Sequence, residues 1–303
     1  MRTLTQAQVQ VHLNQALNKV YQAPRPVFES DKLIPRGTNG IREGAESFSW
    51  QEVSEFGMAN FVDRYAKDLP PVGITSTTKY AGVSILGDSY SFSFFDLQNA
   101  QFEGTPLNTR LATAARNGHL RKQDAVALKG DSARGFTGFV NNPNVTLVAI
   151  PNGGWDTLGT TATGDTIVAD VQAIIDAIKA ATNNLENPNR IAIASKVYAK
   201  LNNLRMDSNG DSPRVLQYLK DAFPQITEWL SVDALNGAGV NGKDRVVVYT
   251  FAEDAVMNVV PMEFTQIPEQ WAGLAATVNC VSTTAGTIFF RPLSAAYADV
   301  SST

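Results

Sequence analysis

Residues 89–131 read SYSFSFFDLQNAQFEGTPLNTRLATAARNGHLRKQDAVALKGD and join two hydrophobic periodicities. In the first part, Tyr90, Phe92 and Phe94 alternate with serine residues, which is the period of a strand with one buried face. Residues 96–103 are then typical of a short helix or turn. The pattern predicts an aromatic strand that leads directly into a short helical segment.

A long helix is predicted for residues 106–129. Gly104 interrupts the preceding segment, Thr105 is a suitable N-cap, and Pro106 fits a first helical position, where no N–H is needed. Apolar or small residues then recur at steps of three and four: Leu107, Leu111, Ala114, Ala115, Gly118, Ala125 and Leu128. Gly130 ends the pattern. At about 1.5 Å per residue the helix would be roughly 35 Å long, which suits an extended plate better than the wall of a pocket.

This stretch resembles the spine-helix region of tailed-phage major capsid proteins with the Hong Kong 97-type fold, which encapsulin nanocompartments share. Within it the resemblance is carried by the aromatic strand and by Asp96-Leu97, Ala100, Gly104-x-Pro106-Leu107, Ala114-Ala115-Arg116 and Gly130-Asp131. Outside it the matching elements are Gly44-Ala45-Glu46, residues 65–70 and residues 138–143. The resemblance implies an α+β fold of the Hong Kong 97 type, with an N-terminal arm, an extended hairpin loop, a long spine helix, a peripheral domain and an axial domain.

On this resemblance the chain divides into four parts. Residues 1–34 form an arm, in which Thr5 can cap a short amphipathic helix ahead of the extended Ala23-Pro24-Arg25-Pro26. Residues 44–88 form the hairpin loop, and residues 151–249 form the axial domain. The peripheral domain takes residues 35–43, 89–150 and 250–303, with the spine helix at about 105–129.

Periodicity also predicts the elements of the second half of the chain. Helices are expected at residues 165–182, at residues 195–204 with Ser195 as N-cap, and from Ser212-Pro213 to just before Pro224. Strands are expected at residues 190–194, 226–232, 245–251, 255–260, 275–282 and 287–290.

The hairpin is predicted from alternation and from its turn. Phe48 and Trp50 alternate with serine on the outward strand, residues 75–85 are rich in Thr, Tyr and Val, and residues 68–73 (DLPPVG) form a rigid turn. A two-stranded ribbon alone is marginal in water, and the resemblance implies that it reaches over a neighbouring subunit. The expected interface residues are Trp50, Phe56, Phe61, Tyr65 and Lys67 in the hairpin, and Asn236, Gly237, Asn241 and Gly242 in a loop near a five- or six-fold axis.

Two short motifs imitate ligand sites. Residues 237–244 (GAGVNGKD) match a phosphate-binding loop as far as the lysine, but Asp244 replaces the Ser or Thr, and residues 245–249 are typical of a strand where a helix is needed. Residues 207–211 begin like a calcium loop, but Ser212 and Tyr218 stand where Gly and Glu are required. We therefore interpret both as ordinary loops.

No catalytic or metal site is predicted. His12 and His119 have no cysteine or second histidine at ligand spacing, and His119 is expected on the helix surface near Arg116 and Lys122. Cys280, the single cysteine, is expected to be a small buried hydrophobic residue. The sequence offers no general acid or base, so we expect neither an enzyme nor a cofactor.

Composition limits the classes of partner. The net charge of −4 argues against a nucleic-acid binder acting by bulk electrostatics, although residues 1–42 carry a net positive charge. Neither an apolar signal segment nor a membrane-spanning run is predicted. If the chain packages DNA, as the resemblance implies, its contacts with that DNA would therefore be weak and non-specific.

The resemblance implies a major capsid protein of a tailed phage that assembles with itself, as hexamers and pentamers, into an icosahedral shell around double-stranded DNA. The partners expected with it are a portal, a separate scaffolding protein and a decoration protein, and the expected location is the virion, with the host cytoplasm during assembly. Three alternatives stay open: an encapsulin-type shell protein, a soluble α/β enzyme of unknown reaction, and a ring-forming tail or adaptor protein.

Overall fold

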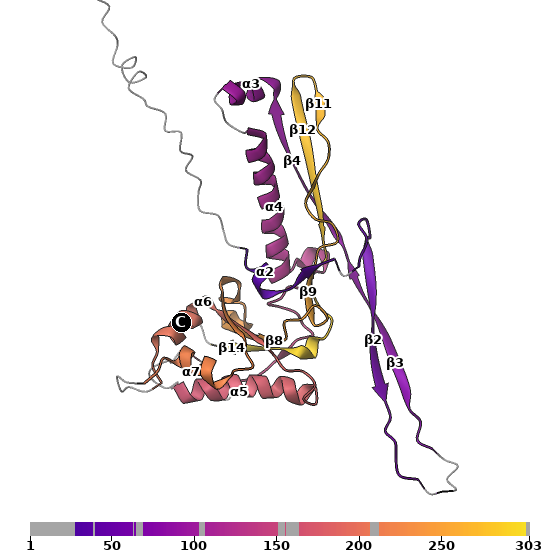
Figure 1. Ribbon diagram of the computed structural model, residues 1–303, viewed down its shortest axis with the longest axis vertical. Coiled ribbons are helices and arrows are strands. Elements are labelled where there is room, and N and C mark those ends of the chain that lie inside the picture. The colour runs from indigo at the N-terminus through magenta and orange to yellow at the C-terminus, as the bar shows by residue number, and fades with distance from the viewer. Residues whose placement is uncertain are drawn as a thin grey trace, which may run out of the picture.

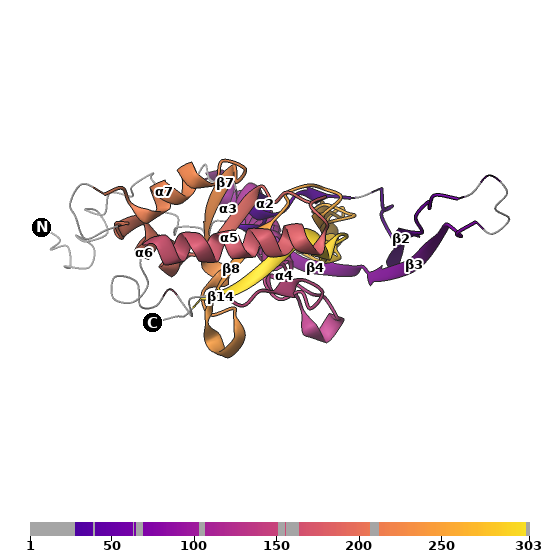
Figure 2. The same cartoon turned by 90° about the horizontal axis from the view of Figure 1, so that it is seen from below.

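The computed structural model describes residues 28–38, 40–62, 64, 69–102, 107–150, 155, 164–206 and 212–300. The helix predicted near the N-terminus lies outside these residues. The described chain has an upright unit, a lower unit and a long hairpin that projects away from both (Figure 1). The view from below shows the hairpin extending well beyond the body of the subunit (Figure 2).

The upright unit is a long strand pair covered by the spine helix. Strand β4 (Ser84–Ser93) pairs antiparallel with β12 (Ala275–Thr284) along its whole length, and β10 (Thr265–Gln266) and β11 (Gln270–Ala272) also pair with β12. Helix α3 (Phe94–Phe102) follows β4, and α4 (Leu107–Lys129) runs back beside the sheet (Figure 1). Phe92, Ala115 and Cys280 meet in the core between helix and sheet, so the small-residue face of the helix packs against the aromatic strand and β12.

A small sheet joins the two units. Its order is β1 (Arg36–Gly37), β9 (Val256–Val259) and β13 (Gly286–Phe289). Met257, Val259 and Ile288 are buried there, together with Ala285. Just before β1, α2 (Ser30–Leu33) packs near α4.

The lower unit is a five-stranded sheet with helices against it. Its strand order is β5 (Thr146–Leu147), β14 (Ala295–Val300), β8 (Asp244–Tyr249), β6 (Arg190–Ala194) and β7 (Glu228–Val232). Helices α5 (Gly164–Ala181), α6 (Ser195–Asn203) and α7 (Val215–Ala222) pack around this sheet, with α5 lying along β14 (Figure 2). Every residue of β8 is buried: residues 246–249 (VVVY) are apolar or aromatic, and the charged Asp244 and Arg245 precede them.

Three segments lie differently from the expected division of the chain. Residues 146–147 and 295–300, both grouped by sequence with the peripheral domain, form β5 and β14 of the lower sheet, with β14 between β5 and β8. Leu33 and Ile34, expected at the end of an arm, are buried in the same core, and the hydroxyl of Tyr249 donates to the Leu33 carbonyl at 2.6 Å. Most of the side chains in these segments are apolar, so burial stabilises them.

Candidate subunit interfaces

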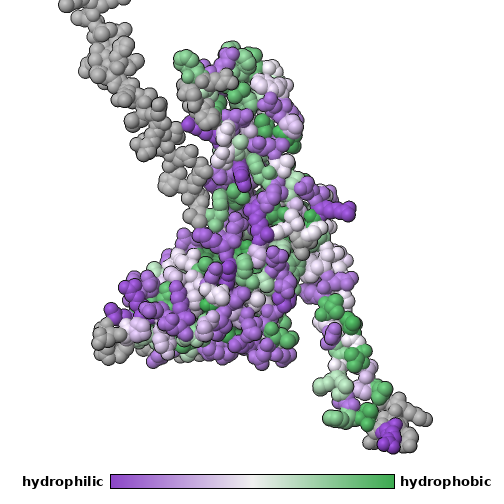
Figure 3. Space-filling view, viewed as in Figure 1, coloured by the Kyte–Doolittle hydropathy of each residue, from purple (hydrophilic) through white to green (hydrophobic). Residues whose placement is uncertain are grey.

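The hairpin carries many exposed apolar side chains along a two-stranded ribbon. Strands β2 (Ser47–Phe56) and β3 (Gly73–Gly82) pair from Ser47 opposite Gly82 to Phe56 opposite Gly73, and among the described residues they pair with no other strand. Its exposed large apolar residues are Val53, Phe56, Met58, Phe61, Val62, Leu69, Val72, Ile74 and Tyr80. Hydrophobic side chains follow the ribbon towards its tip (Figure 3).

The predicted hairpin residues differ in their surroundings. Phe56 and Phe61 are exposed, whereas Tyr65 and Lys67 lie outside the described residues. Trp50 is half-buried at the hairpin base, where its ring meets Phe290 edge-on at 5.4 Å. Trp50 therefore fastens the hairpin to its own subunit, because its neighbours on that face belong to the same chain.

A second group of exposed apolar side chains lies at the far end of the upright unit, on α3 and at β11. The group consists of Phe94, Phe95, Phe102, Trp271 and Leu274. Green surface at the top of the molecule marks this end of the upright unit (Figure 3). The two uncovered apolar surfaces thus lie at opposite extremities of the chain.

The loop before β8 presents three of the four expected axial residues. Gly237, Asn241 and Gly242 are exposed, but Asn236 is half-buried, and its side chain is hydrogen-bonded within the same subunit. The Asn236 side chain accepts the Lys196 N–H at 3.3 Å and donates to the Ser195 hydroxyl at 2.7 Å. Ser195 was expected to cap α6, and this was wrong: Ala194 is the N-cap residue, and Asn236 supplies the side-chain acceptor from a distant loop.

The same loop is fastened to the sheet by two carboxylates. Asp244 Oδ1 accepts the Gly237 N–H at 2.8 Å, and Asp299 Oδ2 accepts the Val240 N–H at 2.8 Å. Asp299 also holds Arg245 through contacts of 2.7 and 3.1 Å. Asp244 and Arg245 are buried. The predicted strand is confirmed as β8 and stands where a phosphate-binding loop needs a helix, while Asp244 accepts a hydrogen bond from the backbone of the loop.

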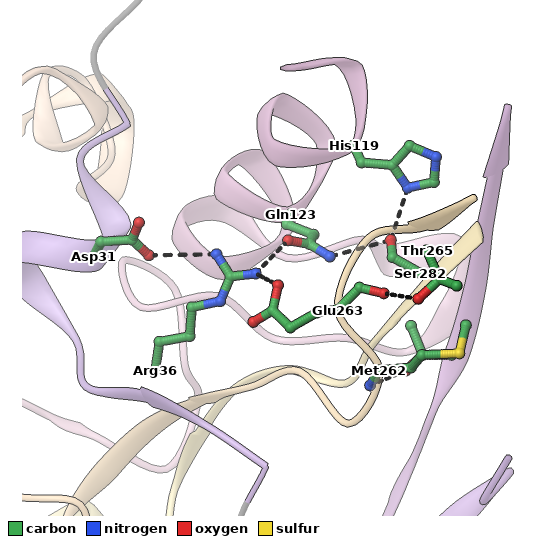
Figure 4. A network of polar contacts seen from close by, with 9 residues as sticks. Asp31, Arg36, His119, Gln123, Met262, Glu263, Thr265 and Ser282 are labelled. Carbon is green, nitrogen blue, oxygen red and sulfur yellow. Dashed lines mark hydrogen bonds and ion pairs between the residues drawn. The ribbon is translucent and has the colours of Figure 1, made fainter. Parts of the chain in front are cut away.

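A polar network joins the start of the described chain to the spine helix. Arg36 of β1 lies 2.7 Å from Glu263 and donates to Gln123 of α4 at 2.9 Å, and Gln123 donates to Ser282 of β12 at 3.1 Å (Figure 4). Asp31 of α2 also lies 3.8 Å from Arg36. Residues 31–36 are therefore fixed to both α4 and the upright sheet.

His119 belongs to this network and not to the helix surface, so its expected exposure was wrong. Only 4% of the residue is exposed. Its Nδ1 lies 2.7 Å from the Ser282 hydroxyl, and its Nε2 lies 3.1 Å from an Asp88 carboxylate oxygen (Figure 4 shows the Ser282 contact). Ser282 is fully buried and Asp88 lies at the surface, so this histidine, serine and aspartate connect the spine helix to both long strands of the upright sheet.

Residues 138–143 close the C-terminal end of the spine helix. The last four carbonyl groups of a helix lack partners within it. Here the N–H groups of Gly130, Phe139 and Val140 bind the carbonyls of residues 126, 127 and 128, and the Asn141 amide binds that of Lys129 at 2.9 Å. All four carbonyls are therefore satisfied, which gives this turn a physical role.

Burial also sets the ionisation of several side chains. Burial raises the pKa of Tyr249 and of Tyr297 far above the ordinary tyrosine value. Burial, and then the neighbouring Asp88 charge, raises the pKa of the Cys280 thiol, so the predicted buried cysteine is confirmed and is a poor nucleophile.

Within the described part of the chain, no three His, Cys, Asp or Glu side chains gather closely enough to hold a metal ion. Residues 207–211, the calcium-loop imitation, lie outside that part. A search of the described helices finds none with the length and apolar character needed to cross a membrane.

Solved structures with the same fold come from phage capsids and related particles. A chain of the capsid of Myoviridae phage XM1 has a TM-score of 0.77 at 16% identity, with 96% of this chain and 97% of that chain covered. A chain from Mycobacterium phage Adephagia has a TM-score of 0.68 at 11% identity, covering 100% and 99%. A chain from the capsid of a native GTA particle has a TM-score of 0.67 at 12% identity, covering 99% of both. The Hong Kong 97-type fold is confirmed by these likenesses.

Sequence comparison identifies a family for this chain but no individual curated relative. No curated protein sequence matches it. The family model of the major capsid protein matches residues 57–300, which include the hairpin tip, the spine helix and the lower sheet. This chain therefore belongs to the major capsid protein family.

Proposed function

We propose that this capsid protein forms the shell of a tailed phage, with rings of five and six copies closing into an icosahedral container for double-stranded DNA. The observation that carries the proposal is the hairpin, a two-stranded ribbon whose apolar side chains have no cover within the subunit. A large exposed apolar surface marks an interaction site. In a closed shell every subunit has neighbouring copies of the same chain, and such a neighbour can bury the exposed side chains of the hairpin.

The size of this surface suits repeated weak contacts. Complete burial of one large apolar side chain is worth about 1.5–3 kcal/mol, so burial of the exposed hairpin residues could contribute on the order of 10 kcal/mol. Association itself costs roughly 4–15 kcal/mol. One hairpin contact is therefore marginal, and a subunit needs several contacts at once, as it has in a shell.

We assign the exposed apolar residues of the hairpin, including Phe56 and Phe61, to a contact with the adjacent copy, and Tyr65 and Lys67 stay predictions for the same contact. The apolar group on α3 and at β11 would meet another copy at the opposite extremity. The loop that contains Gly237, Asn241 and Gly242 is assigned to the ring axis. The lower unit, with β5 and β14 included, would be the axial domain, and the upright unit would be the peripheral domain.

Other partners follow from the same proposal. A portal and a separate scaffolding protein would direct closure, and a decoration protein could bind the outer face. The net charge of −4 makes contact with packaged DNA weak, non-specific and sensitive to salt. The protein would be found in the virion, and in the host cytoplasm during assembly.

Negative-stain electron microscopy of the purified protein tests the proposal. Hollow particles of uniform size are expected, because only copies of the chain can cover the hairpin. A uniform small species would contradict it and favour the soluble-enzyme alternative. An encapsulin shell would also be hollow, so the genes beside this one decide between those two: terminase or portal genes exclude the encapsulin.

A further inference from the structure

The loop between η2 (Asp233–Leu235) and β8 is closed by its own backbone. The Gly239 N–H donates to the Lys243 carbonyl at 2.7 Å, and the Lys243 N–H returns to the Val240 carbonyl at 3.3 Å. Together with the Gly242 N–H on the Gly239 carbonyl at 3.2 Å, these bonds form the short helical turn η3 (Val240–Gly242). The loop is therefore an ordered structure within one subunit, with Val240 and Asn241 exposed on it.

Its glycines and asparagine are required by this shape. Asn241 has a φ of 59° and Gly242 a φ of 75°, in the left-handed region that costs most side chains energy. Gly239 has an ordinary φ, but a Cβ there would meet the Asp299 carboxylate at 2.6 Å. The glycines and the asparagine of GAGVNG therefore fit a backbone that needs left-handed residues and approaches the Asp299 carboxylate closely.

Two groups hold that carboxylate, the Arg245 guanidinium and the Val240 N–H. Asp299 lies opposite Arg245 in the β14–β8 pair, and Arg245 donates both to Asp299 and to the Val140 carbonyl, the latter at 2.6 Å. Asp299 in turn accepts the Val240 N–H, while Asp244 accepts that of Gly237. The shape of the loop is therefore set by the sheet beneath it.

We infer that Asp244 and Asp299 are positioning residues that pre-form this loop as the contact between copies at the ring axis. The inference rests on the proposed function, which places the loop at that axis. The contact would depend on backbone shape and not on the Asn241 amide group. A loop that is already ordered loses little conformational entropy on binding, which favours association at five- and six-fold positions alike.

Two substitutions at one position separate shape from side chain. Asn241→Gly removes the amide but keeps the left-handed backbone, whereas Asn241→Val is β-branched and disfavours it. We expect N241G to assemble as the wild type does. We expect N241V to need a subunit concentration about five- to thirtyfold higher for half-assembly, measured by light scattering and electron microscopy.

Asn184 provides the matched control. It also has a positive φ, 62°, but lies in the turn after α5. N184V should therefore lower the subunit melting temperature as N241V does and leave the assembly concentration unchanged. If N241V assembles normally, if N241G is as defective as N241V, or if N184V impairs assembly equally, the inference is overturned.

A measurement on the unassembled subunit keeps the inference separate from the proposed function. Amide hydrogen exchange followed by NMR should show the Val240 and Gly237 N–H groups protected in the wild type. The Val240 amide should become unprotected in D299N, provided that variant keeps the folded spectrum. Fast exchange of both amides in the wild type would refute pre-formation, whereas a wild type that forms no shell despite a protected loop would refute the proposed function alone.

Discussion

Single buried polar residues connect segments that are far apart in this chain. The Arg245–Asp299 pair fastens β14 to β8 and to the loop before β8, while the Tyr249 and Tyr297 hydroxyls donate to the carbonyls of Leu33 and Phe139, both at 2.6 Å. Each of these groups would be costly to bury without its partner. The largest effects of single substitutions are therefore expected at these sites.

The Arg245–Asp299 pair gives the first prediction. Asp299→Ala should lower the free energy of unfolding by about 3–5 kcal/mol, because it leaves the Arg245 charge buried and unpaired. The double variant Arg245→Met with Asp299→Leu should cost less than Asp299→Ala alone, since no charge remains. Urea unfolding followed by circular dichroism measures both. A double variant less stable than the single one would contradict this account.

The buried tyrosines predict loss of stability in alkali. Burial raises the pKa of Tyr249 and Tyr297 above the ordinary value of 10.0, so the neutral hydroxyl is favoured in the folded state. The two tyrosines contribute fully to the free energy of unfolding below pH 10. This contribution is lost as the pH rises above 10, because the unfolded chain then releases the hydroxyl protons that the folded chain still holds. Urea unfolding at a series of pH values should show this fall, and it should be shallower in Tyr297→Phe. A constant free energy of unfolding through this range would contradict the prediction.

At the scale of elements, the turn after the spine helix is predicted to tolerate no side chain at Gly138. A Cβ there would collide with the Leu128 carbonyl and the Gly130 N–H, which belong to the helix end. Gly138→Ala should therefore lower the free energy of unfolding by about 1–3 kcal/mol. Gly82→Ala is the control, because a Cβ at Gly82 meets nothing within 4 Å. If the two substitutions lower the free energy of unfolding equally in urea, the claim that the helix end leaves no space for a side chain at Gly138 is refuted.

The hairpin is predicted to be dispensable for folding and necessary for assembly. Ser54 and Thr75 face each other in the β2–β3 pair, so residues 55–74 can be replaced by Asn-Gly, which forms a tight two-residue turn. The shortened subunit should keep the wild-type melting temperature, because the removed apolar residues are exposed, and should form no shells. Calorimetry and electron microscopy measure the two properties. An unfolded subunit would show that the hairpin belongs to the core.

Local patterns predicted the elements that depend on neighbours in sequence. The aromatic strand, the spine helix and its end at Gly130, helix α5 and the buried strands β6 and β8 all follow from periodicity and glycine placement. Strand β14 was missed because its sequence, AAYADV, becomes a strand only through pairing with β8 and β5. Its Tyr297, which closes the turn after the spine helix, could have been noticed as an aromatic residue near the chain end.

The candidate site was predictable only in part for the same reason. Apolar residues on a ribbon can be recognised as uncovered, which gave Phe56 and Phe61. Contacts across the fold cannot be read from a sequence: Trp50 meets Phe290, Asn236 serves α6, and His119 meets Ser282. Asp244 departs from the phosphate-loop pattern, and this departure could have indicated a loop that is hydrogen-bonded to the adjoining strand of its own sheet.

At the scale of the whole molecule, the subunit is a packed body with exposed apolar side chains at two of its ends. The body has its own core across the lower and joining sheets, and the spine helix carries the upright sheet away from it. The hairpin and the α3–β11 end project from this body with apolar residues exposed (Figures 1 and 3). Folding of one chain thus leaves these apolar side chains exposed, and in our proposal further copies of the chain bury them.

A cryo-electron microscopy reconstruction of the particle formed by the purified full-length chain tests this claim most directly. We expect a closed shell in which the hairpin lies on an adjacent copy and Phe56, Met58 and Ile74 are buried against it. A hairpin folded onto its own subunit, or one that projects into solvent with those side chains uncovered, would contradict the account.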